Sequence, residues 1–156
     1  MTPEELVKSL KTFDAKFLGY RCDTSSFDSL SEINELVTVW KMVLNEFELC
    51  GTCFTIRDED DFSELGGEIQ FMTPEAIVDE VTNAYPGIVV STMGYLPIAA
   101  CLEGSGDYYY LKKDSKNFNV YRVLHECLDS DLSVDPEKIE HINSLQLIIE
   151  KSNSYK

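Results

Sequence analysis

The residues best equipped for chemistry in this chain are its five cysteines, two of which lie close together. Cys50 and Cys53 enclose two residues in a Cys-x-x-Cys motif. A thioredoxin-like redox motif follows a strand and precedes a helix, whereas here a helical pattern precedes the motif and residues 53–56 form a strand-like run. A structural zinc site requires a second closely spaced pair of ligands, and the sequence has none. The odd number of cysteines argues against a disulfide framework, so we expect Cys50 and Cys53 to be structural thiols.

Two histidines, His125 and His141, are the remaining candidates for acid–base chemistry. Neither has an evident activated nucleophile near it in the sequence, and His125-Glu126-Cys127 does not have the spacing of a known metal-ligand motif. Gly104-Ser105-Gly106 is neither a nucleophile elbow nor a phosphate-binding loop, and we interpret it as a β-turn in which glycine supplies a positive φ. We therefore predict no catalytic residue, no metal site and no cofactor, while the sequence leaves a hydrolase open.

Carboxylates dominate the charge of the chain. There are 28 acidic side chains against 13 basic ones, which gives a formal net charge of −15. A nucleic-acid-binding protein needs a basic footprint, and an anionic membrane surface would repel this chain. A basic macromolecule would be attracted, although acidity can also serve solubility alone. The densest acidic run, residues 58–64, lacks the pattern of an EF-hand calcium loop, and its mutual repulsion predicts an exposed loop.

Aromatic and β-branched runs separated by turn residues predict antiparallel strands in the second half of the chain. The runs cover residues 95–102, 108–111 and 118–124, with turns at 103–107 and 114–117. The last two runs are expected to form a hairpin. Because strand side chains alternate, Tyr109 and Leu111 should share one face, as should Phe118, Val120 and Arg122. Residues 53–56, 68–72 and 88–91 are further extended segments.

Capping residues mark the expected helices. Thr2, Thr73 and Asp135 each precede a proline and an acid, the pattern of a helix start. The first helix is expected to reach about Lys16, and the third to span residues 73–84. A capping box at residues 29–32 opens the longest helical pattern, with Gly51 as a stop. The last helix is expected to open at Pro136 and to present isoleucines 139, 142, 148 and 149 with Leu145 on one face.

The length and the order of these elements predict one domain, residues 1–156. The N-terminal residues lack the positive region and apolar core of a signal peptide, and no apolar run has membrane-spanning length, so a cytoplasmic location is expected. We predict an α+β fold with a mixed or antiparallel sheet of about six strands and helices packed on one side. Residues 1–50 should be helical, and residues 151–156 a frayed tail.

A family resemblance rests on four motifs in the central strands. These are Leu96-Pro97-Ile98-Ala99, Gly104-Ser105-Gly106-Asp107, Tyr109-Tyr110-Leu111, and Val120-Tyr121-Arg122-Val123-Leu124-His125-Glu126. Together they resemble the SUKH superfamily, which includes a yeast cell-wall-synthesis regulator and many bacterial immunity proteins. The similarity extends more loosely to Glu68-Ile69-Gln70-Phe71 and the helix after it. Residues 1–50 diverge, because the usual helix ending in Leu-Pro and the usual Asn-Gly turn are missing.

The resemblance implies a non-catalytic binding module. Bacterial members bind and neutralise a toxin domain, often a nuclease or a deaminase, which makes an immunity protein the expected function and a basic toxin domain the expected partner. The alternative is an intracellular scaffold or regulator of the same fold. The acidic residues that we expect to contact the partner are Asp58, Glu59, Asp60, Asp61, Glu64, Asp107, Asp129 and Asp131.

Overall fold

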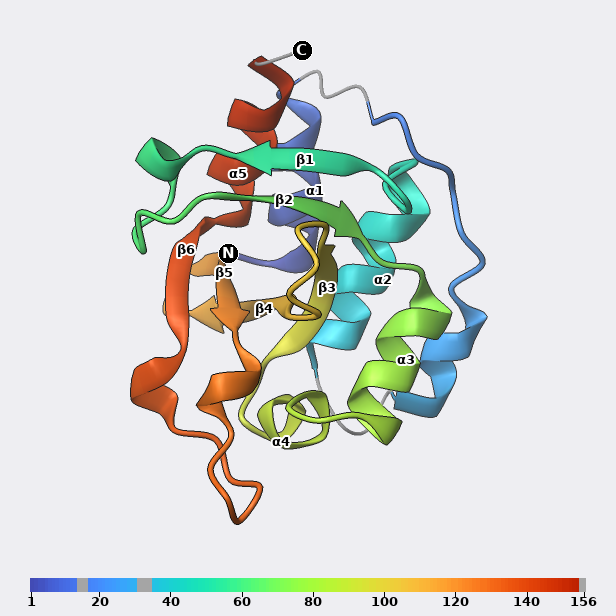
Figure 1. Ribbon diagram of the computed structural model, residues 1–156. Helices are drawn as coiled ribbons and strands as arrows, with labels where there is room; N and C mark the ends of the chain where they lie inside the picture. Colours follow the sequence, from blue (N-terminus) through green and yellow to red (C-terminus); the bar gives the residue numbers. More distant parts are fainter. Residues whose placement is uncertain (14–16, 31–34, 155–156) are drawn as a thin grey trace.

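Six antiparallel strands form the centre of the protein. The computed structural model describes residues 1–13, 17–30 and 35–154 (Figure 1). Each strand pairs with the next one along the chain, and the sheet curls into a half-barrel. The predicted α+β class and strand number are confirmed. The strands are β1 (Cys53–Ile56), β2 (Gly67–Phe71), β3 (Leu96–Cys101), β4 (Tyr108–Asp114), β5 (Asn117–Val123) and β6 (Glu140–Ser144).

Three helices cover one face of this sheet. Figure 1 shows α1 (Pro3–Lys11), α2 (Leu36–Glu46) and α5 (Leu145–Ser154) behind the strands, with α3 (Pro74–Asn83) beside them. Their apolar sides meet the inner face of the sheet in one buried cluster. Trp40 of α2 stacks on Phe71 of β2 at a ring distance of 5.9 Å. Thr2 and Thr73 accept hydrogen bonds from the first turns of α1 and α3, as the capping patterns predicted.

The predicted hairpin is confirmed as β4 and β5. Tyr109 lies opposite Arg122, Leu111 opposite Val120, and Lys113 opposite Phe118. Tyr109, Leu111, Phe118, Val120 and Arg122 are all buried. These residues share the face toward the main core because successive strand side chains point to opposite faces. The hairpin therefore contributes four apolar residues and one arginine to the interior.

The opposite face of the sheet has a smaller cover. Helix α4 (Gly87–Thr92) and the short 3₁₀ turns His125–Cys127 and Pro136–Lys138 lie near it. Tyr110 and Val123 point to this side and form a second buried cluster with Val90 of α4. Tyr110 also donates a hydrogen bond of 3.4 Å to Glu80, a buried carboxyl group of α3.

Two expected elements are wrong. Residues 88–91 are helical, because this short β-branched run follows Pro86 and packs Val90 onto Tyr110 instead of pairing with a strand. Pro136 opens only a 3₁₀ turn, and residues 140–144 form an edge strand on β5. The isoleucine spacing also fits a helix, but pairing with β5 outweighs that local pattern. The last helix begins at Leu145, where the Ser144 hydroxyl accepts a hydrogen bond from Leu147 N–H.

Two expected boundaries also change. The first helix ends at Lys11, where Thr12 closes the last turn, and residues 14–16 lie outside the described residues. The capping box at residues 29–32 falls partly outside them as well. Ser29 and Leu30 belong to a 3₁₀ turn, Ser25–Leu30, and α2 begins at Leu36.

Cys50 is not a free thiol. It forms a disulfide with Cys22, 28 positions earlier, and only Cys53 of the motif is free and exposed. Tyr20 and Cys50 exchange two backbone hydrogen bonds of 3.0 and 3.2 Å, which bring the connector carrying Cys22 alongside Cys50. The expectation of two structural thiols is therefore wrong for Cys50, because the number of cysteines does not show which of them the fold brings together.

None of the helices in the described part of the chain combines the length and the apolar composition that a bilayer crossing requires.

The turn between β3 and β4 allows a direct test of its glycines. Gly104 and Gly106 have φ angles of +84° and +74°, as the turn prediction required. No heavy atom outside the adjacent residues lies within 4 Å of a Cβ built on Gly104, so Gly104→Ala should lose about 1–2 kcal/mol from backbone strain alone. Gly104→Asn should lose less, because asparagine tolerates this conformation. Urea unfolding measures both variants, and a stabilised alanine variant would contradict the turn.

Glu80 makes stability depend on pH. Burial raises the pKa of Glu80 above its usual 4.5, while hydrogen bonds from Tyr110 and Gly87 partly offset that effect. The folded protein therefore binds this proton more tightly than the unfolded chain. The stabilisation is complete below the unfolded pKa and is lost as pH rises through the folded pKa. Glu80→Gln cannot ionise, so its stability relative to the parent should increase with pH.

Urea unfolding at about pH 4 and about pH 8 measures this difference. Glu75→Gln, an exposed change on the same helix, is the matched control and should show no comparable increase. Equal effects of Glu80→Gln at the two pH values would contradict the role of the buried carboxyl group.

Candidate functional site

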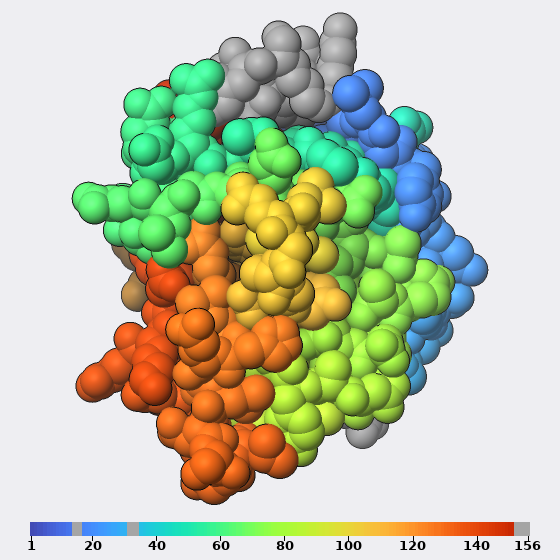
Figure 2. Space-filling view, in the orientation of Figure 1, coloured from blue at the N-terminus to red at the C-terminus, as the bar shows by residue number. Residues whose placement is uncertain are grey.

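Three connections meet at one end of the sheet. In an antiparallel meander, alternate connections lie at the same end, so β1–β2 (residues 57–66), β3–β4 (residues 102–107) and β5–β6 (residues 124–139) share an end. Figure 2 shows these three segments side by side on one face of the molecule, coloured green, yellow and orange. We name this region the three-loop end. All eight acidic residues that the sequence suggested as partner contacts belong to it.

The first connection displays part of the acidic run. Asp58, Glu59 and Glu64 are exposed and line one open hollow of about 450 Å³. Asp60 is half-buried in the same 3₁₀ turn, Asp58–Asp60. The Arg57 guanidinium lies 3.5 Å from Glu59 and offsets part of this charge. The other carboxylates leave the hollow negative, which suits a cationic group of a partner.

Asp61 is not an exposed contact, so its place in the expected binding set is wrong. Its residue is 4% exposed, and its carboxylate lies 3.2 Å from the Arg122 guanidinium. It also accepts hydrogen bonds from Ser63 N–H at 2.7 Å, from the Ser63 hydroxyl at 2.6 Å and from Gly66 N–H at 2.9 Å. These donors replace the water molecules that an exposed carboxylate would bind.

Arg122 anchors the first connection to the middle of the sheet. Besides Asp61, its guanidinium donates to the Gly66 carbonyl at 2.8 Å and to the Ser63 hydroxyl at 3.1 Å. It donates to the Tyr109 hydroxyl at 3.2 Å and lies 3.6 Å from Glu140. Burial alone would lower the pKa of Arg122, but Tyr109 and the charges of Asp61 and Glu140 outweigh it and raise the pKa. The arginine is therefore charged, and its guanidinium is occupied by these partners.

The same connection also crosses to the far edge of the sheet. Phe62 N–H donates to the Ile142 carbonyl at 2.9 Å, and the Asn143 side chain donates to the Asp60 carbonyl at 3.2 Å. The Phe62 ring packs on His141, which stacks on Tyr121 of β5. His141, expected in a helix, lies on β6, where burial lowers its pKa and favours the neutral imidazole. Residues 58–62 thus link β1 to β6, the two edge strands.

Asp107 lies at the base of the three-loop end, not on its rim. It is 8% exposed and accepts hydrogen bonds from His125 N–H at 2.9 Å and from His125 Nδ1 at 2.5 Å. This corrects the expectation of an accessible rim charge. It also supplies the neighbour that His125 lacked in the sequence, since the registers of β3, β4 and β5 bring together residues 18 positions apart.

An Asp–His pair orients an imidazole as general bases require, but catalysis also needs a nucleophile within hydrogen-bond reach. In the described ranges, no hydroxyl or thiol forms a hydrogen bond with His125; the Ser105 hydroxyl instead accepts from Asp107 N–H at 3.2 Å. No group of three or more His, Cys, Asp or Glu side chains in those ranges is arranged to hold a metal ion. Within the described residues, the pair therefore orients His125 without a bonded nucleophile.

The third connection carries two exposed acids on a fixed tip. Asp129 and Asp131 are exposed, as expected. The Ser133 hydroxyl donates to Asp131 at 2.6 Å, and hydrogen bonds from Ser133 lower the pKa of that carboxyl group. Leu132 between them has a φ of +66° and donates its N–H to the backbone carbonyl of Asp129. A leucine in this conformation is strained, and here its side chain is half-exposed.

Apolar side chains accompany these charges. Seven large apolar side chains are exposed within the described residues, and four of them lie on the three connections. These four are between 45% and 68% exposed; they are Phe62, Leu65, Leu102 and Leu132. Exposed apolar groups concentrated in one region mark an interaction surface better than scattered ones do. The sequence did not single out these residues, because nothing in it showed which apolar positions lie outside the core.

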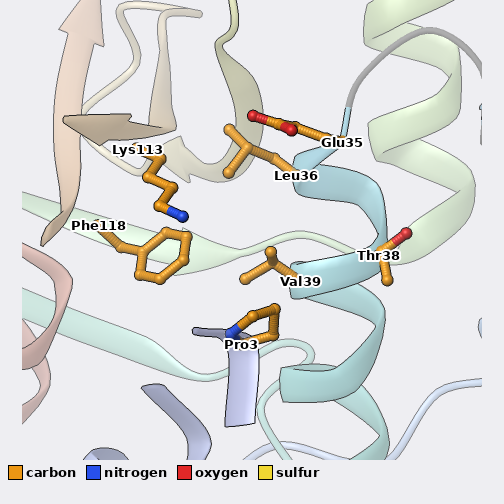
Figure 3. Close-up of a pocket in the computed structure, with 7 residues that line it drawn as sticks. All are labelled: Pro3, Glu35, Leu36, Thr38, Val39, Lys113 and Phe118. Carbon is orange, nitrogen blue, oxygen red and sulfur yellow. The ribbon is translucent and has the colours of Figure 1, made fainter. Parts of the chain in front are cut away.

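A separate apolar cavity lies at the opposite end of the sheet. Figure 3 shows Lys113 and Phe118 of the hairpin facing Leu36 and Val39 of α2, with Pro3 below. The cavity has a volume of about 290 Å³, and the Lys113 amino group lies 5.8 Å from the centre of the Phe118 ring. Lys113 and Glu35 are its charged lining residues. The cavity lacks the concentrated acidic charge of the three-loop end.

The anchor is testable through stability. Arg122→Ala should lower the free energy of unfolding by about 3–5 kcal/mol, because it leaves the Asp61 carboxylate buried without its counter-ion. Replacing both members, Asp61→Leu with Arg122→Met, should lose less than the single change. Denaturant unfolding measures each variant. Lys11→Ala, which breaks the exposed pair between Lys11 and Glu46, is the control and should change stability little. A double variant less stable than Arg122→Ala would contradict the ion-pair explanation.

The chain matches no protein-family model, no curated protein and no solved structure.

Proposed function

We propose that this chain is a non-catalytic binding module that neutralises a basic toxin domain by covering its active site with the three-loop end. The observation that carries the proposal is the coincidence of charge and apolar surface. Exposed carboxylates at Asp58, Glu59, Glu64, Asp129 and Asp131 lie on the same connections as four exposed apolar side chains.

This combination matches the physics of protein recognition. Apolar side chains provide most of the contact energy at the centre of an interface, and polar groups form its rim. A nuclease must carry positive charge to hold phosphates, so its active-site face would be complementary to these acids. Charge of opposite sign also speeds association by electrostatic steering. The resemblance of residues 94–126 to SUKH immunity proteins supports the same class of partner.

We propose the cytoplasm as the place of action, because an immunity protein meets an incoming toxin inside the cell. The Cys22–Cys50 bond would be reduced in that compartment. The two backbone hydrogen bonds between Tyr20 and Cys50 would then hold the connector in place.

A scaffold or regulator of the same fold is the second candidate. The exposed apolar groups favour it equally, since they serve any protein partner. The net charge of −15 favours the immunity function, because it attracts a basic partner and disfavours the binding of nucleic acid. Protection of cells against a toxin domain distinguishes the two.

The decisive experiment first looks beside this gene for a large secreted protein that ends in a small basic domain, and then uses that domain. Co-expression should protect cells from that domain, and the purified pair should associate quickly at low salt. Reversing the exposed acids, Asp58→Lys with Glu59→Lys and Glu64→Lys, should slow association by about tenfold or more and flatten its salt dependence. Asp61 stays unchanged in this variant because it is part of the buried anchor.

The matched control reverses three exposed acids away from the three-loop end, Glu4, Glu48 and Glu150. It carries the same net charge as the test variant, so a difference between the two variants reports position, not overall charge. Equal slowing by both would remove the claim for this surface. Absence of binding and of protection with every adjacent toxin domain would end the immunity proposal and leave the scaffold.

A further inference from the structure

The three connections enclose a hollow of about 350 Å³. Its walls include Leu65 from the first connection, Glu103 and Asp107 from the second, and Leu124 from the third. In Figure 2 the segments that contribute these residues converge on one face. We propose that this hollow is a socket for an arginine side chain, and that the basic partner places its anchor residue there. The inference rests on the proposed function for the identity of the partner, but the socket itself can be tested alone.

Asp107 provides the first argument. Its side chain is 11% exposed, and both hydrogen bonds that it accepts, from His125 N–H and from His125 Nδ1, reach the same oxygen, Oδ1. Its Oδ2 receives no hydrogen bond from the described residues, and Asp107 lines the hollow. Oδ2 is not sealed from solvent, so a hydrogen-bond donor that enters the hollow can reach it. A ligand that bonds this oxygen must be a hydrogen-bond donor, and a cation fits best because charge-assisted hydrogen bonds to a carboxylate are the strong ones.

The charge balance of the hollow provides the second argument. Arg122 also lines it, but its guanidinium is bonded to Asp61 and lies beside Glu140. That cation is therefore offset within its own network. The remaining carboxylates, Asp107 and Glu103, leave the hollow negative, and Glu103 is exposed at its mouth. A cationic side chain would enter with one carboxylate at the base and one at the rim.

Shape selects arginine over lysine. Leu65 and Leu124 give the hollow apolar walls, and a guanidinium is planar and weakly hydrated, so its faces can lie against such walls while its edge bonds carboxylates. An ammonium group is compact and strongly hydrated and would lose more water for fewer directed bonds. Arginine is also enriched among the residues that dominate binding energy at protein interfaces.

The test uses small probes and the whole chain. The ¹⁵N-labelled protein is titrated at about pH 8 with N-acetyl-argininamide, N-acetyl-lysinamide and N-acetyl-citrullinamide, and amide shifts are followed by NMR. Citrulline keeps the shape of arginine without its charge. We expect saturable shifts at residues 65–66, 102–107 and 122–125 with argininamide, weaker shifts with lysinamide, and none of that pattern with citrullinamide, because the charge-assisted bonds are lost.

Glu103→Gln and Asp107→Asn should each weaken argininamide binding by about threefold to tenfold, in line with the loss of a charge-assisted hydrogen bond. Glu75→Gln, which removes an equal charge on α3, should leave binding unchanged. If Asp107→Asn fails to fold, Glu103→Gln still decides, since its side chain is exposed. Equal binding of citrullinamide, shifts located elsewhere, or no effect of Glu103→Gln would overturn the socket.

The outcomes separate the two proposals. A toxin domain that binds through the reversed acids, without any response of the hollow to argininamide, would overturn the socket and keep the proposed function. A hollow that binds argininamide in a chain that protects against no toxin would keep the socket and overturn the function.

Discussion

The structure depends on one buried ion pair, Asp61 with Arg122. The two side chains are 0% and 7% exposed, so each charge has lost most of its water and is compensated by the other. The pair fastens the β1–β2 connection to β5, and the same connection is bonded to Ile142 and Asn143 of β6. The connection thereby links β1 and β6, the two edge strands of the curled half-barrel. The fold and the three-loop end therefore share one constraint.

This constraint explains how a run of acids can be displayed without collapsing its own loop. Asp58, Glu59, Asp60 and Glu64 repel one another, and the loop would extend or fray if nothing opposed them. Asp61 differs from its neighbours because it faces inward and uses its charge to bind the loop to the sheet. One member of the run thus supplies the attachment that lets the others remain exposed. The exposed carboxylates then keep fixed positions on the surface, and their combined field can steer a partner of opposite charge.

The sequence predicted what depends on local pattern. Alternating aromatic and β-branched residues were sufficient for the β4–β5 hairpin and for the side that Tyr109, Phe118 and Arg122 occupy. Glycine chemistry was sufficient for the positive φ angles of Gly104 and Gly106. In each case, neighbours in the chain decide the conformation.

Long-range pairing decided the rest. Residues 140–144 fit a helix by spacing but pair with β5, and residues 88–91 resemble a strand but cover Tyr110. Cys22 with Cys50, Asp107 with His125, and Asp61 with Arg122 are each brought together by strand order or backbone pairing. Neither the composition nor a local motif predicts which distant residues come into contact. The candidate site was therefore predicted at the level of its segments, while the roles of Asp61 and Asp107 within it were not.

The order of the loop tips also affects the free energy of binding. Loops that order themselves on contact lose conformational entropy, which weakens association. Here the tips are ordered beforehand: Asp61 accepts from Ser63 and Gly66, and Ser133 ties Asp131 and Asp129 around a strained Leu132. The strain at Leu132 lowers the stability of the free protein, whereas the exposed side chains of Phe62, Leu65 and Leu102 contribute little to it. Because the tips are already ordered, a partner of the proposed kind would require little rearrangement, and the apolar contacts would add more of their free energy to binding.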